Sequence, residues 1–174
     1  MRLLTSLLLL AVSGPEAGTS PVPVPPASSA ADYCGAERAP GQVSEPCIDL
    51  KKQQILFPEL LFAIDNAELR PQSFGTLEKL VPLILRHPEL GPLEVRGHRA
   101  YHPSVDLQAR GRRDLTQLRA ESVKQLLVAK GVPSERLSAR GYKATLPIVE
   151  PATSLKNRRI EIVILQPPAR PSPR

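Results

Sequence analysis

The prolines of this chain separate the part that can form a core from the parts that cannot. The 174 residues include 20 prolines, and eleven of them crowd into the stretch before residue 47 and the stretch after residue 166. The segments 21–51 and 167–174 otherwise hold mainly small and polar residues, so they cannot bury enough apolar surface to offset the entropy lost on ordering. We predict an extended linker over residues 21–51, one folded domain over residues 52–166 and an extended tail over residues 167–174.

The N-terminus has the pattern of a secretory signal. Arg2 provides a positive charge, residues 3–12 form a mainly apolar run, and small residues follow from Ser13. The run is too short to span a bilayer, which requires about 20 apolar residues. We therefore predict that residues 1–20 are a signal peptide removed on export, with no transmembrane segment in the mature chain. An N-terminus retained as an anchor is the alternative.

Export decides how the two cysteines and the net charge are interpreted. In an oxidising compartment Cys34 and Cys47 could pair, which would stabilise the fold by about 2 to 3 kcal/mol in the chain-entropy model. The sequence leaves that pairing open. The formal net charge of +6 could indicate nucleic-acid binding. Export and an aromatic content of 3% argue against it, because single-strand binders need aromatic stacking faces.

Hydrophobic periodicity within the predicted domain indicates alternating strands and helices. We expect strands over residues 55–62, 93–97, 137–142 and 159–165, and helices from Pro71 onward and over residues 112–130. Pro58 should place the first strand at an edge or a bulge, and Pro82 should kink the first helix or end it early. The order β-α-β-α-β-β predicts an α+β sandwich in which two main helices pack on a small mixed sheet.

Arg119 is the residue of the second helix that most needs a partner. On a helical wheel it falls inside an apolar arc made by Leu115, Leu118, Ala120, Val123, Leu126 and Leu127. An unpaired buried guanidinium is costly, so Arg119 should lie near a carboxylate, a row of carbonyls or an anionic ligand. Three roles stay open at this point: a structural ion pair, a packed stem whose charged head reaches water, and ligand binding.

The motifs of the predicted domain follow one another in the order of a known family. They are Gly97-His98, residues 115–120, Gly131-Val132 with Arg136-Leu137, Gly141-Tyr142, Pro147-Ile148 and residues 157–162. In order and character these motifs resemble the OmpA-like C-terminal domain. That family has the sandwich fold inferred above, and it usually tethers envelope proteins of bacteria to peptidoglycan. The resemblance therefore implies a non-catalytic peptidoglycan-binding module in the periplasm, near the outer membrane or cell wall.

The resemblance also implies which residues bind the ligand. Family members commonly hold diaminopimelate of the peptide stem between an aspartate after the Gly-His segment and an arginine on the following helix. Arg119 matches that arginine, and Arg158 matches a second position that can face the ligand. A planar guanidinium suits the carboxylates that diaminopimelate carries. This chain has Ala100 where the family has the aspartate, so the expected site lacks one carboxylate.

Two aspartates could supply the missing charge. Asp106 lies in the loop after Ala100, which is longer here than the family pattern, and we predict that Asp106 takes the role. Asp114 is the alternative, although its place at a helix start is explained more simply by the helix dipole. Ala100 also supports a second hypothesis, in which a divergent domain has lost glycan binding and serves as a structural or protein-interaction domain for other envelope proteins.

Metal binding and catalysis find little support in the sequence. His98, His102 and Asp106 are spaced by four residues, as metal ligands on one helical face would be. Pro103 lies among them, however, and the stretch has the character of a loop. No serine stands in a recognisable nucleophile motif with a base. We predict no enzyme activity, no metal and no cofactor.

Overall fold

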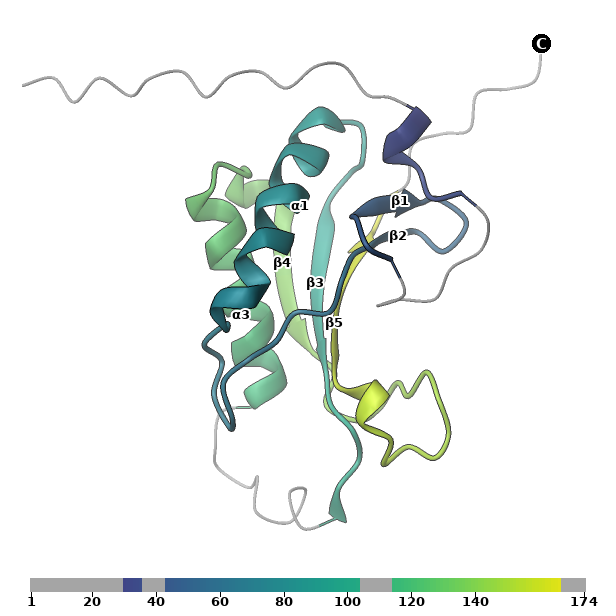
Figure 1. Cartoon of the computed structure of the whole chain (residues 1–174), viewed down its shortest axis with the longest axis vertical. Helices are drawn as coiled ribbons and strands as arrows, with labels where there is room; N and C mark the ends of the chain where they lie inside the picture. The colour runs from purple at the N-terminus through teal and green to yellow at the C-terminus, as the bar shows by residue number, and fades with distance from the viewer. Residues whose placement is uncertain (1–29, 36–42, 104–113, 167–174) are drawn as a thin grey trace, which may run out of the picture.

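A five-stranded mixed sheet carries the described part of the chain, with helices on one side of it (Figure 1). The computed structural model describes residues 30–35, 43–103 and 114–166. The strands are β1 (Cys47–Asp49), β2 (Gln54–Leu56), β3 (Leu93–His98), β4 (Leu137–Gly141) and β5 (Arg159–Ile164). They lie in the order β1-β2-β5-β3-β4, in which only β3 and β4 pair in parallel. The predicted α+β class is confirmed, whereas the predicted signal peptide and tail lie outside the described residues.

The main core fills the space between this sheet and two helices, α1 (Phe74–Arg86) and α3 (Leu115–Ala129). The strand registers align Ile55, Ile162 and Val95 across β2, β5 and β3, so alternation places their side chains on one face of the sheet. The helices contribute buried side chains to the same cluster: Leu77, Leu80 and Ile84 from α1, and Ala120, Val123 and Leu127 from α3. In the described ranges, no helix combines the length and the apolar content needed to cross a membrane.

The first helix continues through Pro82, so of the two predicted outcomes, a kink or an early end, the early end does not occur. A 3-10 turn, η2 (Pro71–Ser73), leads directly into α1, which runs on to Arg86. A proline inside a helix costs about 3 kcal/mol. Val81 and Leu83 on either side of it are buried, and burial of this kind contributes roughly 1.5–3 kcal/mol for each side chain. Packing of this segment against the core therefore offsets the local cost.

The second helix is held tightly against the sheet at its start. It begins at Leu115, three residues later than predicted, because Asp114 acts as its N-cap: the Asp114 carboxylate accepts a hydrogen bond of 3.0 Å from the Thr116 amide. Gly97 of β3 lies beneath this first turn, where a Cβ atom would stand 2.1 Å from the Thr116 carbonyl oxygen. Only glycine allows this approach, which fixes the residues of α3 that follow.

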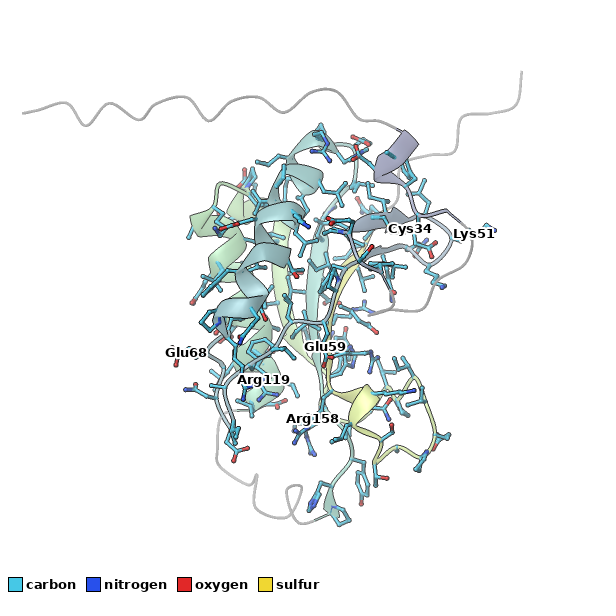
Figure 2. All side chains as sticks on the ribbon, in the orientation of Figure 1. Cys34, Lys51, Glu59, Glu68, Arg119 and Arg158 are labelled. Carbon is cyan, nitrogen blue, oxygen red and sulfur yellow. A yellow bond between two sulfur atoms is a disulfide. The ribbon has the colours of Figure 1, made fainter. Side chains whose placement is uncertain are left out.

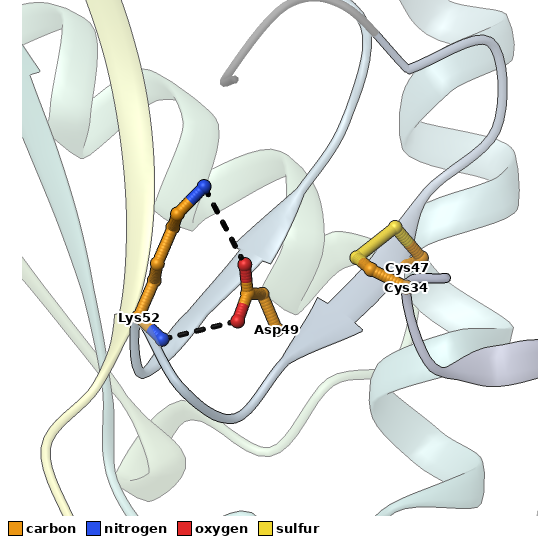
Figure 3. The surroundings of a disulfide bond; sticks show 4 residues. All are labelled: Cys34, Cys47, Asp49 and Lys52. Carbon is orange, nitrogen blue, oxygen red and sulfur yellow. Dashed lines mark hydrogen bonds and ion pairs between the residues drawn. A yellow bond between two sulfur atoms is a disulfide. The ribbon is translucent and has the colours of Figure 1, made fainter. Parts of the chain in front are cut away.

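The prediction of an extended linker up to residue 51 is wrong over residues 30–35 and 43–51. β1 pairs with β2, and Tyr33 forms a parallel bridge with Ile48. Cys34 and Cys47 form a disulfide with their Cα atoms 5.1 Å apart, beside the turn that Lys52 and Asp49 close (Figure 3). A second, smaller apolar cluster forms here from Val43, Cys34, Cys47 and Leu56. A proline-rich composition could not reveal this, because the disulfide and strand pairing supply the order that local apolar content does not.

The first strand is shorter than the predicted segment 55–62. β2 ends at Leu56, two residues before Pro58, which has no amide hydrogen to donate to a ladder. Farther along the chain, Phe62 forms an isolated antiparallel bridge with Leu69. The chain between these points leaves the sheet and leads toward the start of α3, where the candidate site lies.

Candidate functional site

Arg119 lies half-buried near the start of α3 and contacts a turn more than fifty residues away in the sequence. Its Nε donates a hydrogen bond of 2.9 Å to the backbone carbonyl of Asn66, and its guanidinium stacks over the Phe62 ring, 5.0 Å from the centroid. No described carboxylate lies within ion-pair distance of Arg119. The described contacts therefore do not support a structural ion pair.

The turn formed by residues 63–68, called here the 63–68 turn, brings the Asn66 carbonyl to Arg119. The Ala63 amide donates to the Glu68 carbonyl at 2.9 Å, and the Asn66 side chain accepts from the Ala67 amide at 2.7 Å. Asp65 has a positive φ of 50°, a conformation that aspartate and asparagine tolerate better than most residues. This turn was not predicted, although adjacent Asp65 and Asn66 are typical turn residues and could have indicated it.

Arg158 lies close enough to Arg119 for their charges to interact, and both side chains lie in the lower half of the view in Figure 2. Burial lowers the pKa of the Arg119 guanidinium, the positive charge of Arg158 lowers it further, and the negative charge of Asp65 acts in the opposite direction. The two predicted arginines thus lie within electrostatic reach of each other. It also adds Asp65 as a carboxylate of the same neighbourhood.

Asn157 holds Arg158 in place through a buried side-chain amide. Its Oδ1 accepts hydrogen bonds from the Ile148 and Val149 amides at 2.8 and 3.2 Å. Its Nδ2 donates to the Val149 and Ala152 carbonyls at 3.0 and 3.2 Å. With its four bonds, Asn157 ties the loop before β5 to the start of that strand. The asparagine of the Asn-Arg-Arg motif is therefore structural, and Arg158 projects from a rigid base with its side chain exposed.

The predicted carboxylate is not among the described contacts of the site. Ala100 is the second residue after β3, and the residues on either side of it are tied to the loop before β5. The Arg99 amide donates to the Lys143 carbonyl, and the Tyr101 amide to the Ala152 carbonyl, both at 2.9 Å. Asp106 lies outside the described residues. Asp114 is the N-cap of α3, which confirms the structural explanation of that residue.

His98 is a core residue with a carboxylate beside it. It is buried, its Nε2 lies 3.3 Å from Glu161 Oε2 without hydrogen-bond alignment, and its ring stacks on Tyr142. Arg159 Nε donates a hydrogen bond of 2.7 Å to the other oxygen of Glu161. Burial alone would raise the pKa of Glu161, but His98 and Arg159 lower it to about 2. His98 is therefore part of the buried core, and no cluster of three metal-binding side chains occurs among the described residues.

Comparison with known proteins places this arrangement in a family. The model of the OmpA family matches residues 61–161, from just before the 63–68 turn through α3 and into β5. The chain belongs to the OmpA family. The matched segment contains Arg119, Arg158 and Asp65, so the arginine pair lies within the OmpA family domain.

Individual relatives agree with that assignment. The chain is 33% identical over 106 residues to outer membrane porin F of Pseudomonas fluorescens, covering 59% of this chain and 31% of that protein. It is 30% identical over 141 residues to outer membrane protein A of Yersinia pseudotuberculosis, covering 72% and 38%. This OmpA family chain thus spans about a third of the length of these relatives. A solved structure, the cell wall anchor of the T6SS from Pseudomonas aeruginosa, matches with 28% identity and a TM-score of 0.50, covering 60% of this chain and 73% of that one.

Proposed function

We propose that this OmpA family domain is a non-catalytic module of the bacterial envelope that binds peptidoglycan in the periplasm. The observation that carries the proposal is the pair formed by Arg119 and Arg158. The positive charge of Arg158 acts on Arg119, and no described carboxylate forms an ion pair with Arg119. An anionic ligand would relieve the repulsion between the two arginines, because charge-assisted hydrogen bonds to a carboxylate are strong and directional.

The relatives support the same class of ligand. The similar structure from Pseudomonas aeruginosa is a cell wall anchor, and the two similar sequences belong to outer membrane proteins. Peptidoglycan carries carboxylates on its peptide stems, so it offers the anion that the arginine pair requires.

We further propose that the ligand group is diaminopimelate in the peptide stem. Diaminopimelate that ends a peptide stem has two free carboxylates, which suit Arg119 and Arg158, and one of its two amino groups remains an ammonium. An ammonium requires an anion beside it, and Ala100 cannot provide one. Asp106 is our proposed partner from the longer loop, and Asp65 is a second candidate because its charge acts on Arg119.

Loss of glycan binding is the competing proposal, and Ala100 is the observation that favours it. In that case the domain would serve as a structural or protein-interaction module of the envelope. The two proposals differ in what the arginine pair does, so a binding experiment with arginine variants separates them.

The test is co-sedimentation of the purified chain with isolated peptidoglycan. The unmodified chain should sediment, Arg119→Ala and Arg158→Ala should stay in solution, and free diaminopimelate should compete. Arg140→Ala is the matched control, because Arg140 also stacks over an aromatic ring, at 5.2 Å from the Tyr142 centroid, but belongs to the far strand β4. If the unmodified chain stays in solution, or if Arg140→Ala weakens binding as much as Arg119→Ala, the arginine pair is not a peptidoglycan site.

A further inference from the structure

A groove beside the arginine pair separates β5 from the segment that follows β2. Its volume is 330 Å³, and its apolar walls include Phe57, Leu60, Ile148 and Ile160. Phe57 and Leu60 are buried, whereas the Ile148 side chain is 47% exposed. The groove is therefore an open apolar surface, and its residues other than Arg158 have no part in the proposed diaminopimelate site.

One wall of the groove is an open strand edge. The pairing of β2 with β5 ends at Ile55 and Ile162, although β5 begins three residues earlier, at Arg159. The Ile164 amide donates to the Gln53 carbonyl at 2.8 Å, on the β2 side. Because backbone groups alternate along a strand, the Ile160 backbone faces the same side, beyond the last residue pair with β2. No described strand covers this edge, and an extended peptide can pair with such an edge.

The chain that follows β2 leaves the edge open. β2 ends at Leu56, and its residue pairs with β5 end at Ile55 and Ile162. The groove is lined by Phe57, Glu59 and Leu60 on one side and by residues 158–161 on the other, so it occupies the space between the segment 57–60 and β5.

The surface chemistry of the groove indicates what it would bind. Lys156 and Arg158 place two exposed cations along one side, and Glu59 places one exposed carboxylate on the other (Figure 2 labels Arg158 and Glu59). Arg159 and Glu161, also in the lining, bind each other. Two further aliphatic side chains near the groove in sequence, Leu146 and Leu155, are 46% and 70% exposed. The surface thus favours an occupant that combines aliphatic side chains with negative charge.

We propose that this groove binds an extended segment of a partner protein, which adds to the open edge of β5 and carries an acidic residue beside aliphatic ones. Lys156 and Arg158 would face the acidic residue, and Ile148, Ile160 and Phe57 would pack against the aliphatic side chains. A protein segment suits the groove better than a second peptidoglycan stem, whose alanine methyl groups would leave the apolar walls unfilled. This interaction goes beyond peptidoglycan binding and does not depend on Arg119.

The test screens a display library of random heptapeptides for binding to the full chain. Enriched peptides should contain an acidic residue next to valine, isoleucine or leucine, and the Ile160 amide should exchange hydrogen more slowly when such a peptide is bound. Ile148→Glu and Lys156→Glu should each weaken the best peptide by roughly tenfold or more. Leu165→Glu is the matched control: it introduces the same charge at a site 45% exposed, beyond the opposite end of β5, and should change Kd by less than about twofold.

Four outcomes would overturn the proposal. The first is a screen in which no peptides are enriched, and the second is enriched peptides that bind Ile148→Glu and Lys156→Glu with unchanged affinity. The third is a hydrogen-exchange rate of the Ile160 amide that does not change when a peptide binds. The fourth is enriched peptides that no longer bind the Arg119→Ala variant. The last outcome would assign the peptides to the arginine pair instead. Failure of the chain to sediment with peptidoglycan has no effect on these readouts, so the two proposals fail separately.

Discussion

Nε2 of His87 lies 3.1 Å from Oδ2 of Asp32, although 55 positions separate the two residues in the sequence. His87 is fully buried after the end of α1, and its other ring nitrogen lies 2.6 Å from Glu89 Oε1. Arg86 binds the second oxygen of the same Asp32 carboxylate at 2.6 Å. Asp32 therefore completes a polar network at the end of α1, and the segment around it belongs to the folding unit.

Replacing Asp32 should destabilise the domain. Asp32→Ala leaves Arg86 and buried His87 without this carboxylate, which we expect to lower the free energy of unfolding by about 2 kcal/mol in urea denaturation. Glu45→Ala is the control, because its ion pair with Lys79 is exposed and should contribute less than about 1 kcal/mol. Equal losses for the two variants would show that Asp32 is not part of the folding unit.

Arg119 should matter more for binding than for stability. Arg119→Ala removes one hydrogen bond to Asn66 and the stacking contact with Phe62, so the free energy of unfolding should fall by about 1 kcal/mol. Arg140→Ala, which loses a similar stacking contact, should fall by a similar or smaller amount. A loss of about 3 kcal/mol or more for Arg119→Ala would identify it as a structural residue instead.

The carboxylate that faces the ligand ammonium can be identified by substitution. Asp106→Asn should weaken competition by diaminopimelate by about 1.5 to 3 kcal/mol, which is roughly tenfold to a hundredfold in Kd. Pimelate, which has the same two carboxylates and no amino group, should be unaffected by the change. If Asp65→Asn produces this selective loss and Asp106→Asn does not, the role belongs to Asp65.

Acid should weaken the fold through Glu161. Its pKa is about 2 in the folded chain against 4.5 for the ordinary side chain, so the ionised form stabilises the fold. That contribution, about 3 kcal/mol, is complete above pH 4.5 and is lost as the pH falls from 4.5 toward 2. Glu161→Gln should therefore be less stable at neutral pH and should show a flatter dependence of unfolding free energy on pH in this window. An unchanged slope would mean that other carboxyl groups cause the acid sensitivity.

Much of the fold could be predicted because periodicity and turn chemistry are local. The strands near residues 93–97, 137–142 and 159–165 and the helix that ends before Gly131 agree with their patterns. Pro82 misled the prediction, because its local cost competes with burial of neighbouring side chains that a sequence does not display. The N-terminal segment was missed for a related reason: its order depends on the disulfide and on the contacts of Asp32 with α1.

The candidate site was predictable only in part. Arg119 was identified from its place in an apolar arc and Arg158 from the family resemblance, but neither signal revealed that their charges interact. The role of the Asn66 carbonyl as a partner of Arg119 could not be predicted from composition, because every residue has a backbone carbonyl. The direction of the Asn66 carbonyl depends on the positive φ of Asp65, which a sequence suggests but does not fix.

The disulfide between Cys34 and Cys47 determines which path a pulling force would take through the domain if the domain were bound to peptidoglycan. A pull on the chain before Cys34 passes through the covalent bond directly into β1, so residues 35–46 carry none of it. The force then reaches β2 and β5 across the hydrogen bonds between neighbouring strands. Arg158, a residue of the proposed peptidoglycan site, immediately precedes β5. The proposed site and the chain before Cys34 are therefore connected through the sheet, without any stretch of slack chain between them.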